Sequence, residues 1–217
     1  MSQSHSACLA MIAGQLRPNR ISDERLLKAF EAVPRERFVP ATLRGVAYVD
    51  EDLPVASGRY LMEPMVLARL IMDANLEPHD SVLDIGCATG YSTALLAQLA
   101  ESVVALEQDG ELAATAQRKV ADLGLTNVAV LEGKLAMGAP DQAPFDVILL
   151  NGCVERLPKD LLAQLSDGGR LVCVFLEHGV GRGRMVYRLG DIFSTRDLFD
   201  ANVPPLPGFQ KAPTFQF

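Results

Sequence analysis

Apolar runs alternate with segments of helical periodicity through the middle of the chain. Five runs have the length of buried strands, at residues 82–85, 103–106, 127–131, 145–150 and 171–176. Such runs are typical of parallel strands that are covered on both faces. Two further runs, 184–188 and 194–199, flank a tight turn and predict a hairpin. We therefore expect a Rossmann-like α/β fold: a mostly parallel seven-stranded sheet with an antiparallel C-terminal hairpin and helices on both faces.

Helices are predicted before and between these strands. Apolar residues recur three and four positions apart in the segments 22–33, 63–75, 90–99, 110–123 and 159–165. Ser22 is the expected N-cap of the first helix, and Pro34 is expected to end it.

The first 61 residues give weaker signals outside that first helix. Residues 1–10 are expected to fray, and residues 41–61 are expected to be irregular because Gly45, Pro54 and Gly58 interrupt them. The charged residues of segment 35–40 are expected on a solvated, extended surface.

A glycine-rich turn follows the strand predicted at 82–85. Residues 86–90 read GCATG, and Ala88 stands where the dinucleotide fingerprint G-x-G-x-x-G has its second glycine. Asp84 precedes the turn, and Glu107 ends the next strand, where a carboxylate can accept two hydrogen bonds from a ribose diol. This spacing predicts an S-adenosylmethionine loop, with S-adenosylhomocysteine as the product.

Two other interpretations of this segment are open. Asp84 could cap the turn while Glu107 is only a solvated strand end. A dehydrogenase is a further possibility, which Ala88 and the terminal hairpin oppose. Cys87 lies inside the turn, and a small residue that fits the turn explains it better than a nucleophile does.

Length and composition favour one ordered domain. The chain has 217 residues, of which 49% are hydrophobic and 22% charged, as is ordinary for an α/β protein. We expect a single domain over 1–217, with an N-terminal extension and substrate-side loop (1–61), a core (62–200) and an extended tail (201–217). The net charge of −7 argues against a broad nucleic-acid or anionic-membrane surface.

Cysteine and histidine spacing predicts neither a disulfide framework nor a metal site. The four cysteines form no C-x-x-C pair, and the three histidines match no metal-ligand spacing. Free thiols fit a reducing compartment, and no segment has the apolar length of a membrane span. We expect a cytoplasmic protein. His79 is expected in an exposed turn, and His178 either bounds a turn or faces the substrate.

Several motifs together resemble the protein-L-isoaspartate (D-aspartate) O-methyltransferase family. The resemblance begins with QLRPNRISDERLLKAFEAVPRERFVP at residues 15–40, which includes that family's VPRExFVP signature. It continues through VLDIGCATGYSTA at 82–94 and APFD at 143–146. It implies a class I S-adenosylmethionine-dependent methyltransferase that repairs damaged protein by methylating the free carboxylate of isoaspartyl residues.

The same comparison identifies candidate site residues and two departures. The family's G-Q-T-I-S stretch is Gly58-Arg59-Tyr60-Leu61-Met62 here, so Tyr60 and Met62 replace its hydroxyl residues. Arg59 could bind a substrate carboxylate there, or it could be a surface arginine on a flexible loop. The family's G-D-G becomes Gly133-Lys134-Leu135.

We assign Arg59, Tyr60 and Met62 to the substrate loop. The expected cofactor residues are Asp84, Gly86, Cys87, Ala88, Gly90, Tyr91, Glu107, Gln108, Lys134, Leu135 and Asn151. Asn151 could also suggest methylation of a base, but no aromatic pair follows it to stack a nucleotide.

The expected methyl acceptor is a protein or peptide that carries isoaspartate. A carboxylate is ionised near neutral pH and needs no general base. Two alternatives are open: a family member with a different, small acceptor, and a cofactor-binding protein without turnover that acts as a regulator. The sequence leaves the oligomeric state open, with a monomer favoured.

Overall fold

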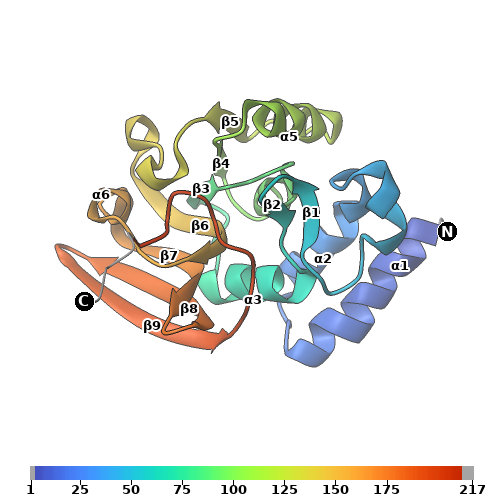
Figure 1. Cartoon of the computed structure of the whole chain (residues 1–217), viewed down its shortest axis with the longest axis horizontal. Coiled ribbons are helices and arrows are strands. Elements are labelled where there is room, and N and C mark those ends of the chain that lie inside the picture. The colour runs from blue at the N-terminus through green and yellow to red at the C-terminus, as the bar shows by residue number, and fades with distance from the viewer. Residues whose placement is uncertain (1–2, 212–217) are drawn as a thin grey trace, which may run out of the picture.

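The computed structural model describes residues 3–211. A seven-stranded sheet lies at the centre of the molecule (Figure 1). Its strand order is β5-β4-β3-β6-β7-β8-β9. The strands are β3 (Ser81–Ile85), β4 (Ser102–Glu107), β5 (Val128–Glu132), β6 (Phe145–Val154), β7 (Leu165–Glu177), β8 (Val180–Leu189) and β9 (Ile192–Asp200). Strands β3 to β7 are parallel, and β8 and β9 are antiparallel. The predicted fold is confirmed.

Helices cover this sheet. They are α1 (Gln3–Met11), α2 (Glu24–Ala32), α3 (Pro64–Ala74), α4 (Tyr91–Leu96), α5 (Gly110–Asp122) and α6 (Lys159–Leu162). Asp23, rather than Ser22, caps α2: its carboxylate accepts hydrogen bonds from the amides of Arg25 and Leu26 at 2.8 and 3.4 Å. Helix α2 ends before Pro34, as predicted.

Alternate residues of the central strands face two separate apolar clusters. Val82 and Val147 belong to the cluster that includes residues of α1 to α4. Leu83 and Ile148 face the opposite side, where Leu206 and other residues near the C-terminus are buried. Both faces of these strands therefore need apolar side chains, which explains their continuous apolar runs.

The N-terminal part differs from the prediction. Residues 3–11 are helical rather than frayed, and residues 41–61 contain a 3₁₀ segment (Ala41–Val46) and a hairpin of β1 (Leu53–Ala56) and β2 (Arg59–Leu61). This hairpin is a two-stranded sheet separate from the central one. The expectation of solvated charges in segment 35–40 is wrong for Arg35, which is completely buried, and is confirmed for Arg37, which is exposed.

The arrangement of strands places a topological switch point between β3 and β6, where α/β sheets bind ligands. The segment 203–209, which we call the strap, crosses this end of β6 (Figure 1). The amide of Cys153 donates to the carbonyl of Pro204 at 2.8 Å, and the amide of Leu206 donates to the carbonyl of Cys153 at 2.8 Å. The rest of the predicted tail, including Pro213, lies outside the described residues.

Two features are absent from the described residues. No helix within 3–211 is long and apolar enough to cross a bilayer. In the same range, no group of three or more His, Cys, Asp or Glu residues is arranged to hold a metal ion.

Candidate cofactor site at the glycine turn

The turn after β3 depends on glycine at both ends. Gly86 and Gly90 have φ of +75° and +92°, which favour glycine. A Cβ on Gly90 would also lie 3.1 Å from Cβ of Ala116, so glycine lets α5 pack closely. Ala88 has a positive φ of 50° although it is not glycine. Its amide donates to Oε2 of Glu107 at 2.8 Å, which helps to hold this conformation.

Asp84 joins three elements beneath the turn. Its carboxylate accepts hydrogen bonds from the hydroxyls of Ser92 at 2.8 Å and Thr93 at 2.6 Å. It also accepts one from Nδ2 of Asn151 on β6. Burial raises the pKa of Asp84 to about 6, although these hydrogen bonds lower it. Asp84 therefore fixes β3, the start of α4 and β6 relative to one another.

Glu107, at the end of β4, is completely buried and surrounded by donors. Oε1 accepts hydrogen bonds from the amides of Gln108 at 2.8 Å and Asp109 at 3.3 Å. Oε2 accepts from the amide of Ala88 and, at 2.7 Å, from Nη2 of Arg59. The alternative of a solvated strand end is therefore wrong for Glu107.

Arg59 reaches this carboxylate from β2. The same Nη2 also donates to the carbonyl of Gly86 at 2.8 Å. Arg59 is only 4% exposed, so the interpretation as a surface arginine on a flexible loop is wrong. Its Nε is buried and has no hydrogen-bond partner within the described chain. The site thus contains an ion pair between two buried side chains.

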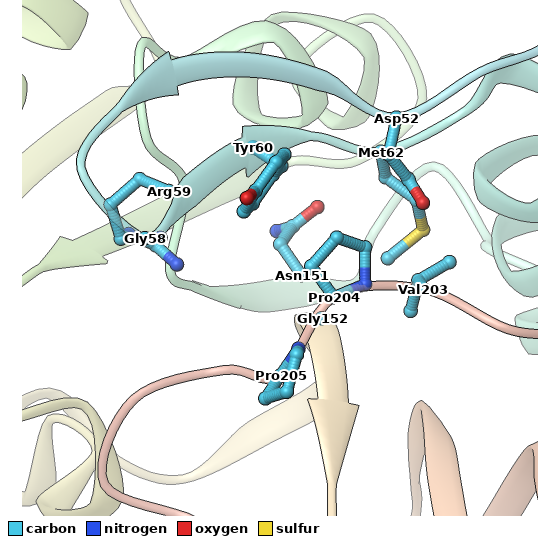
Figure 2. A pocket seen from close by; sticks show the side chains of 10 residues that line it. All are labelled: Asp52, Gly58, Arg59, Tyr60, Met62, Asn151, Gly152, Val203, Pro204 and Pro205. Carbon is cyan, nitrogen blue, oxygen red and sulfur yellow. The ribbon is translucent and has the colours of Figure 1, made fainter.

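The cavity beside the turn is small. A cavity of about 10 Å³, room for about one water molecule, lies between the β1–β2 hairpin, Asn151 and the strap. Figure 2 shows Gly58, Arg59 and Tyr60 on the hairpin side, opposite Asn151 and Pro204. Beside this cavity, Leu206 reaches over Gly86: a Cβ built on Gly86 would lie 2.6 Å from Cδ1 of Leu206.

Comparisons with known proteins agree with this geometry. The family model described as protein-L-isoaspartate (D-aspartate) O-methyltransferase matches residues 9–182. The chain is 44% identical over 162 residues to a protein-L-isoaspartate O-methyltransferase of Koribacter versatilis (strain Ellin345), covering 75% of this chain and 73% of that protein. This chain belongs to the protein-L-isoaspartate (D-aspartate) O-methyltransferase family. A Methanoculleus marisnigri protein of that name is 39% identical over the same length, with 75% and 74% of the two chains covered.

Solved structures support the fold. One named protein-L-isoaspartate O-methyltransferase superposes with a TM-score of 0.81 at 22% identity, over 95% of this chain and 66% of that one. A second, a β-aspartate methyltransferase from Plasmodium falciparum in complex with S-adenosyl-L-homocysteine, gives 0.78 at 18% identity, over 95% and 99%. The fold is that of the family throughout most of the chain.

The family's substrate positions lie beside the cavity. Arg59, Tyr60 and Met62 all line it, with Met62 buried and Tyr60 half-buried (Figure 2). The Met62 thioether cannot donate a hydrogen bond. The structure thus brings these three residues together, while their role toward a substrate stays a prediction.

Besides Asp84 and Gly90, described above, the expected cofactor residues differ in where their side chains lie. Gly86, Ala88, Glu107, Asn151 and the buried Leu135 gather at the turn; Leu135 Cδ1 lies 3.6 Å from a Cβ built on Gly86. The side chains of Gln108 and Lys134 are exposed.

Cys87 and Tyr91 are buried instead. Burial raises the pKa of the Cys87 thiol well above its ordinary value, which fits a packing residue rather than a nucleophile. The Tyr91 ring packs edge-on against Phe38 with centroids 5.4 Å apart, so its side chain belongs to the core.

Two residues near the site escaped the sequence reasoning. Arg35 donates from Nε to the carbonyl of Ala47 at 2.7 Å and from Nη2 to that of Met62 at 2.8 Å, which fixes the end of the substrate loop. Its place in the VPRERFVP motif could have indicated a structural role. For Leu206, the sequence offers only an apolar residue between two prolines of the tail, which is weaker evidence for burial.

Proposed function

We propose that this protein is an S-adenosylmethionine-dependent carboxyl O-methyltransferase that acts on isoaspartyl residues of damaged proteins or peptides. The observation that carries the proposal is the match to the family over most of the chain, with the glycine turn and Glu107 joined at the switch point. When bound, the cofactor supplies an electrophilic methyl group on a sulfonium.

The residues at the turn suit such a cofactor by type. Glu107 is a buried carboxylate at the end of β4, where it can accept from a ribose diol. Gly86 lets a ligand approach the backbone, and Leu135 offers an apolar contact beside it. In the described conformation Arg59 and Leu206 fill this space, so binding requires both side chains to withdraw.

The chain's task in the reaction is mainly to position the two reactants and exclude water. An isoaspartyl carboxylate is already ionised near neutral pH, so no side chain has to remove a proton. Tyr60, Met62 and Arg59 line the space where an acceptor would enter. Of these, Tyr60 and Arg59 carry donors that suit a carboxylate.

A second candidate function has its own support. Met62 stands where the family has a serine, and a thioether offers no hydrogen bond to a carboxylate. This favours a family member that methylates another, smaller acceptor, or one that binds the cofactor without turnover.

Transfer of labelled methyl groups tests the proposal. The full chain is incubated with labelled S-adenosylmethionine and either a peptide containing isoaspartate or the same sequence with normal aspartate. We expect label in the isoaspartyl peptide alone. Cofactor binding without transfer to either peptide would contradict the isoaspartyl assignment and favour the second candidate.

We further propose that the protein works in the cytoplasm as a single domain. Four cysteines that are buried as free thiols suit a reducing compartment. The net charge of −7 makes a protein or peptide a better partner than a nucleic acid.

A further inference from the structure

Glu107 has no acceptor capacity left in the described conformation. A carboxylate offers about four lone-pair sites, two on each oxygen. Here the amides of Gln108 and Asp109 take Oε1, and the amide of Ala88 and the guanidinium of Arg59 take Oε2. Three of these four donors are backbone amides of the turn and the strand end. Arg59 is the one side chain among them, so it is the donor that can leave.

The same side chain blocks the space over the turn. A Cβ built on Gly86 would lie 2.9 Å from Nη2 of Arg59 and 2.6 Å from Cδ1 of Leu206. The cavity beside the turn, which Arg59 helps to line, holds about 10 Å³, compared with roughly 300 Å³ or more for pockets that bind small molecules. A nucleoside cannot enter until both Arg59 and Leu206 move.

The position of Arg59 is suited to release. It lies on β2, whose three residues pair only with β1 in a two-stranded sheet outside the central one. A two-stranded hairpin is marginally stable by itself, and this one is held on the core by the buried Leu53 and Leu61. The turn residue Gly58 is exposed and nothing lies within 4 Å of its Cβ position, so no packing at that position opposes a shift of the hairpin tip.

Arg59 is also imperfectly satisfied where it is. Its Nε is buried without a partner within residues 3–211, which carries a desolvation cost. Arg59 is thus well paired at Nη2, which bonds to Glu107, and unpaired at Nε. The cost at Nε offsets part of the stabilisation at Nη2, so a ligand can replace the contact between Arg59 and Glu107.

We propose that Arg59 competes with the cofactor for Glu107, so that its guanidinium closes the empty site and must be displaced by the ribose hydroxyls. This inference rests on the proposed function, since it concerns the same S-adenosylmethionine site. The apparent affinity for cofactor is then lowered by the fraction of molecules in which Arg59 is bound to Glu107. Arg59 therefore sets the cofactor concentration at which the enzyme becomes loaded.

Calorimetric titration with S-adenosylhomocysteine tests the competition without any need for turnover. Arg59→Gln removes the charged donor, and we expect it to bind about ten- to a hundredfold more tightly than the wild type, the size of one charge-assisted hydrogen bond. Arg184→Gln is the matched control, because Arg184 forms an ion pair of 2.7 Å with Asp197 on the terminal hairpin. It should bind like the wild type.

Arg59→Lys is a second test in case Arg59→Gln does not fold, because lysine keeps a positive charge opposite Glu107. We expect it to bind more tightly than the wild type and less tightly than Arg59→Gln. Equal or weaker binding by folded Arg59 variants would overturn the competition while leaving the proposed function intact. Absence of binding by the wild type and every variant at millimolar ligand would instead overturn the proposed function, and the competition with it.

Hydrogen exchange of the wild type provides an independent readout. Saturation with S-adenosylhomocysteine should speed exchange in β1 and β2, because the anchor between Arg59 and Glu107 is lost. Slower exchange in both strands on ligand binding would contradict the displacement.

Discussion

Replacement of Arg35 by methionine should destabilise the protein strongly. Arg35 is completely buried, and its guanidinium donates to the carbonyls of Ala47 and Met62 and lies 4.9 Å from the centre of the Tyr91 ring. Methionine fills much of the space of the arginine stem but supplies no donor.

The size of the effect follows from these contacts. Each buried carbonyl left without a partner costs about 1–3 kcal/mol, so two cost about 2–6 kcal/mol. The cation–π contact with Tyr91 adds about 1 kcal/mol. Burial lowers the pKa of Arg35, which shows that the charge itself is costly here, and its removal returns part of this sum. We expect a net loss of about 3 kcal/mol in the free energy of unfolding, or roughly 6–12 °C in Tm.

Urea denaturation of the wild type, Arg35→Met and Arg37→Met measures this difference. Arg37 belongs to the same motif but is exposed, and its ion pair with Asp122 is 3.7 Å long. Arg37→Met should therefore stay within about 0.5 kcal/mol of the wild type. Equal effects of the two substitutions, or a loss below about 1 kcal/mol for Arg35→Met, would refute the reasoning.

Three further predictions concern the turn and the substrate loop. Gly90→Ala should lower the free energy of unfolding by about 2–3 kcal/mol in urea denaturation, because of the φ of +92° and the contact with Ala116. The raised pKa of Asp84, about 6 against an ordinary value of 3.8, means that the folded state holds its proton between these pH values and loses stability as pH rises through them. From pH 4 to pH 7, the free energy of unfolding of Asp84→Asn should therefore rise by up to about 3 kcal/mol relative to that of the wild type. Denaturation at each pH measures this difference. The double variant Tyr60→Thr with Met62→Ser should raise the rate of isoaspartyl methylation about tenfold or more, because Met62→Ser adds a hydroxyl donor and Tyr60→Thr replaces a phenol with the smaller hydroxyl residue of the family.

These predictions have their own controls and contrary outcomes. Gly45→Ala should be neutral, since nothing lies within 4 Å of its Cβ position; a matching loss there would remove the packing argument for Gly90. A stability difference between wild type and Asp84→Asn that does not change with pH would show that Asp84 titrates normally. An unchanged methylation rate in the double variant would show that the side chains of Tyr60 and Met62 do not limit turnover.

The sheet could be predicted because its signal is local. Val82 and Leu83 face different apolar clusters, so a strand covered on both sides reads as a continuous apolar run. The glycine turn was equally accessible, since Gly86 and Gly90 are required by backbone geometry within a few residues.

The misses depend on partners far away in the sequence. Arg35 was assigned to the surface from its charge, whereas its burial is explained by carbonyls 12 and 27 residues away. Arg59 bonds to a carboxylate 48 residues away, which no spacing could reveal. Residues 3–11 lack a regular apolar stripe, and burial of Cys8 and Met11 against the core accompanies this helix.

A crystal structure of the chain with S-adenosylhomocysteine tests the central claim, that the glycine turn and Glu107 form the cofactor site, most directly. We predict the ribose hydroxyls on the Glu107 carboxylate and Nη2 of Arg59 more than about 3.5 Å from Oε2, beyond hydrogen-bond reach. A ligand bound elsewhere, with the 2.7 Å contact between Arg59 and Glu107 intact, would contradict it.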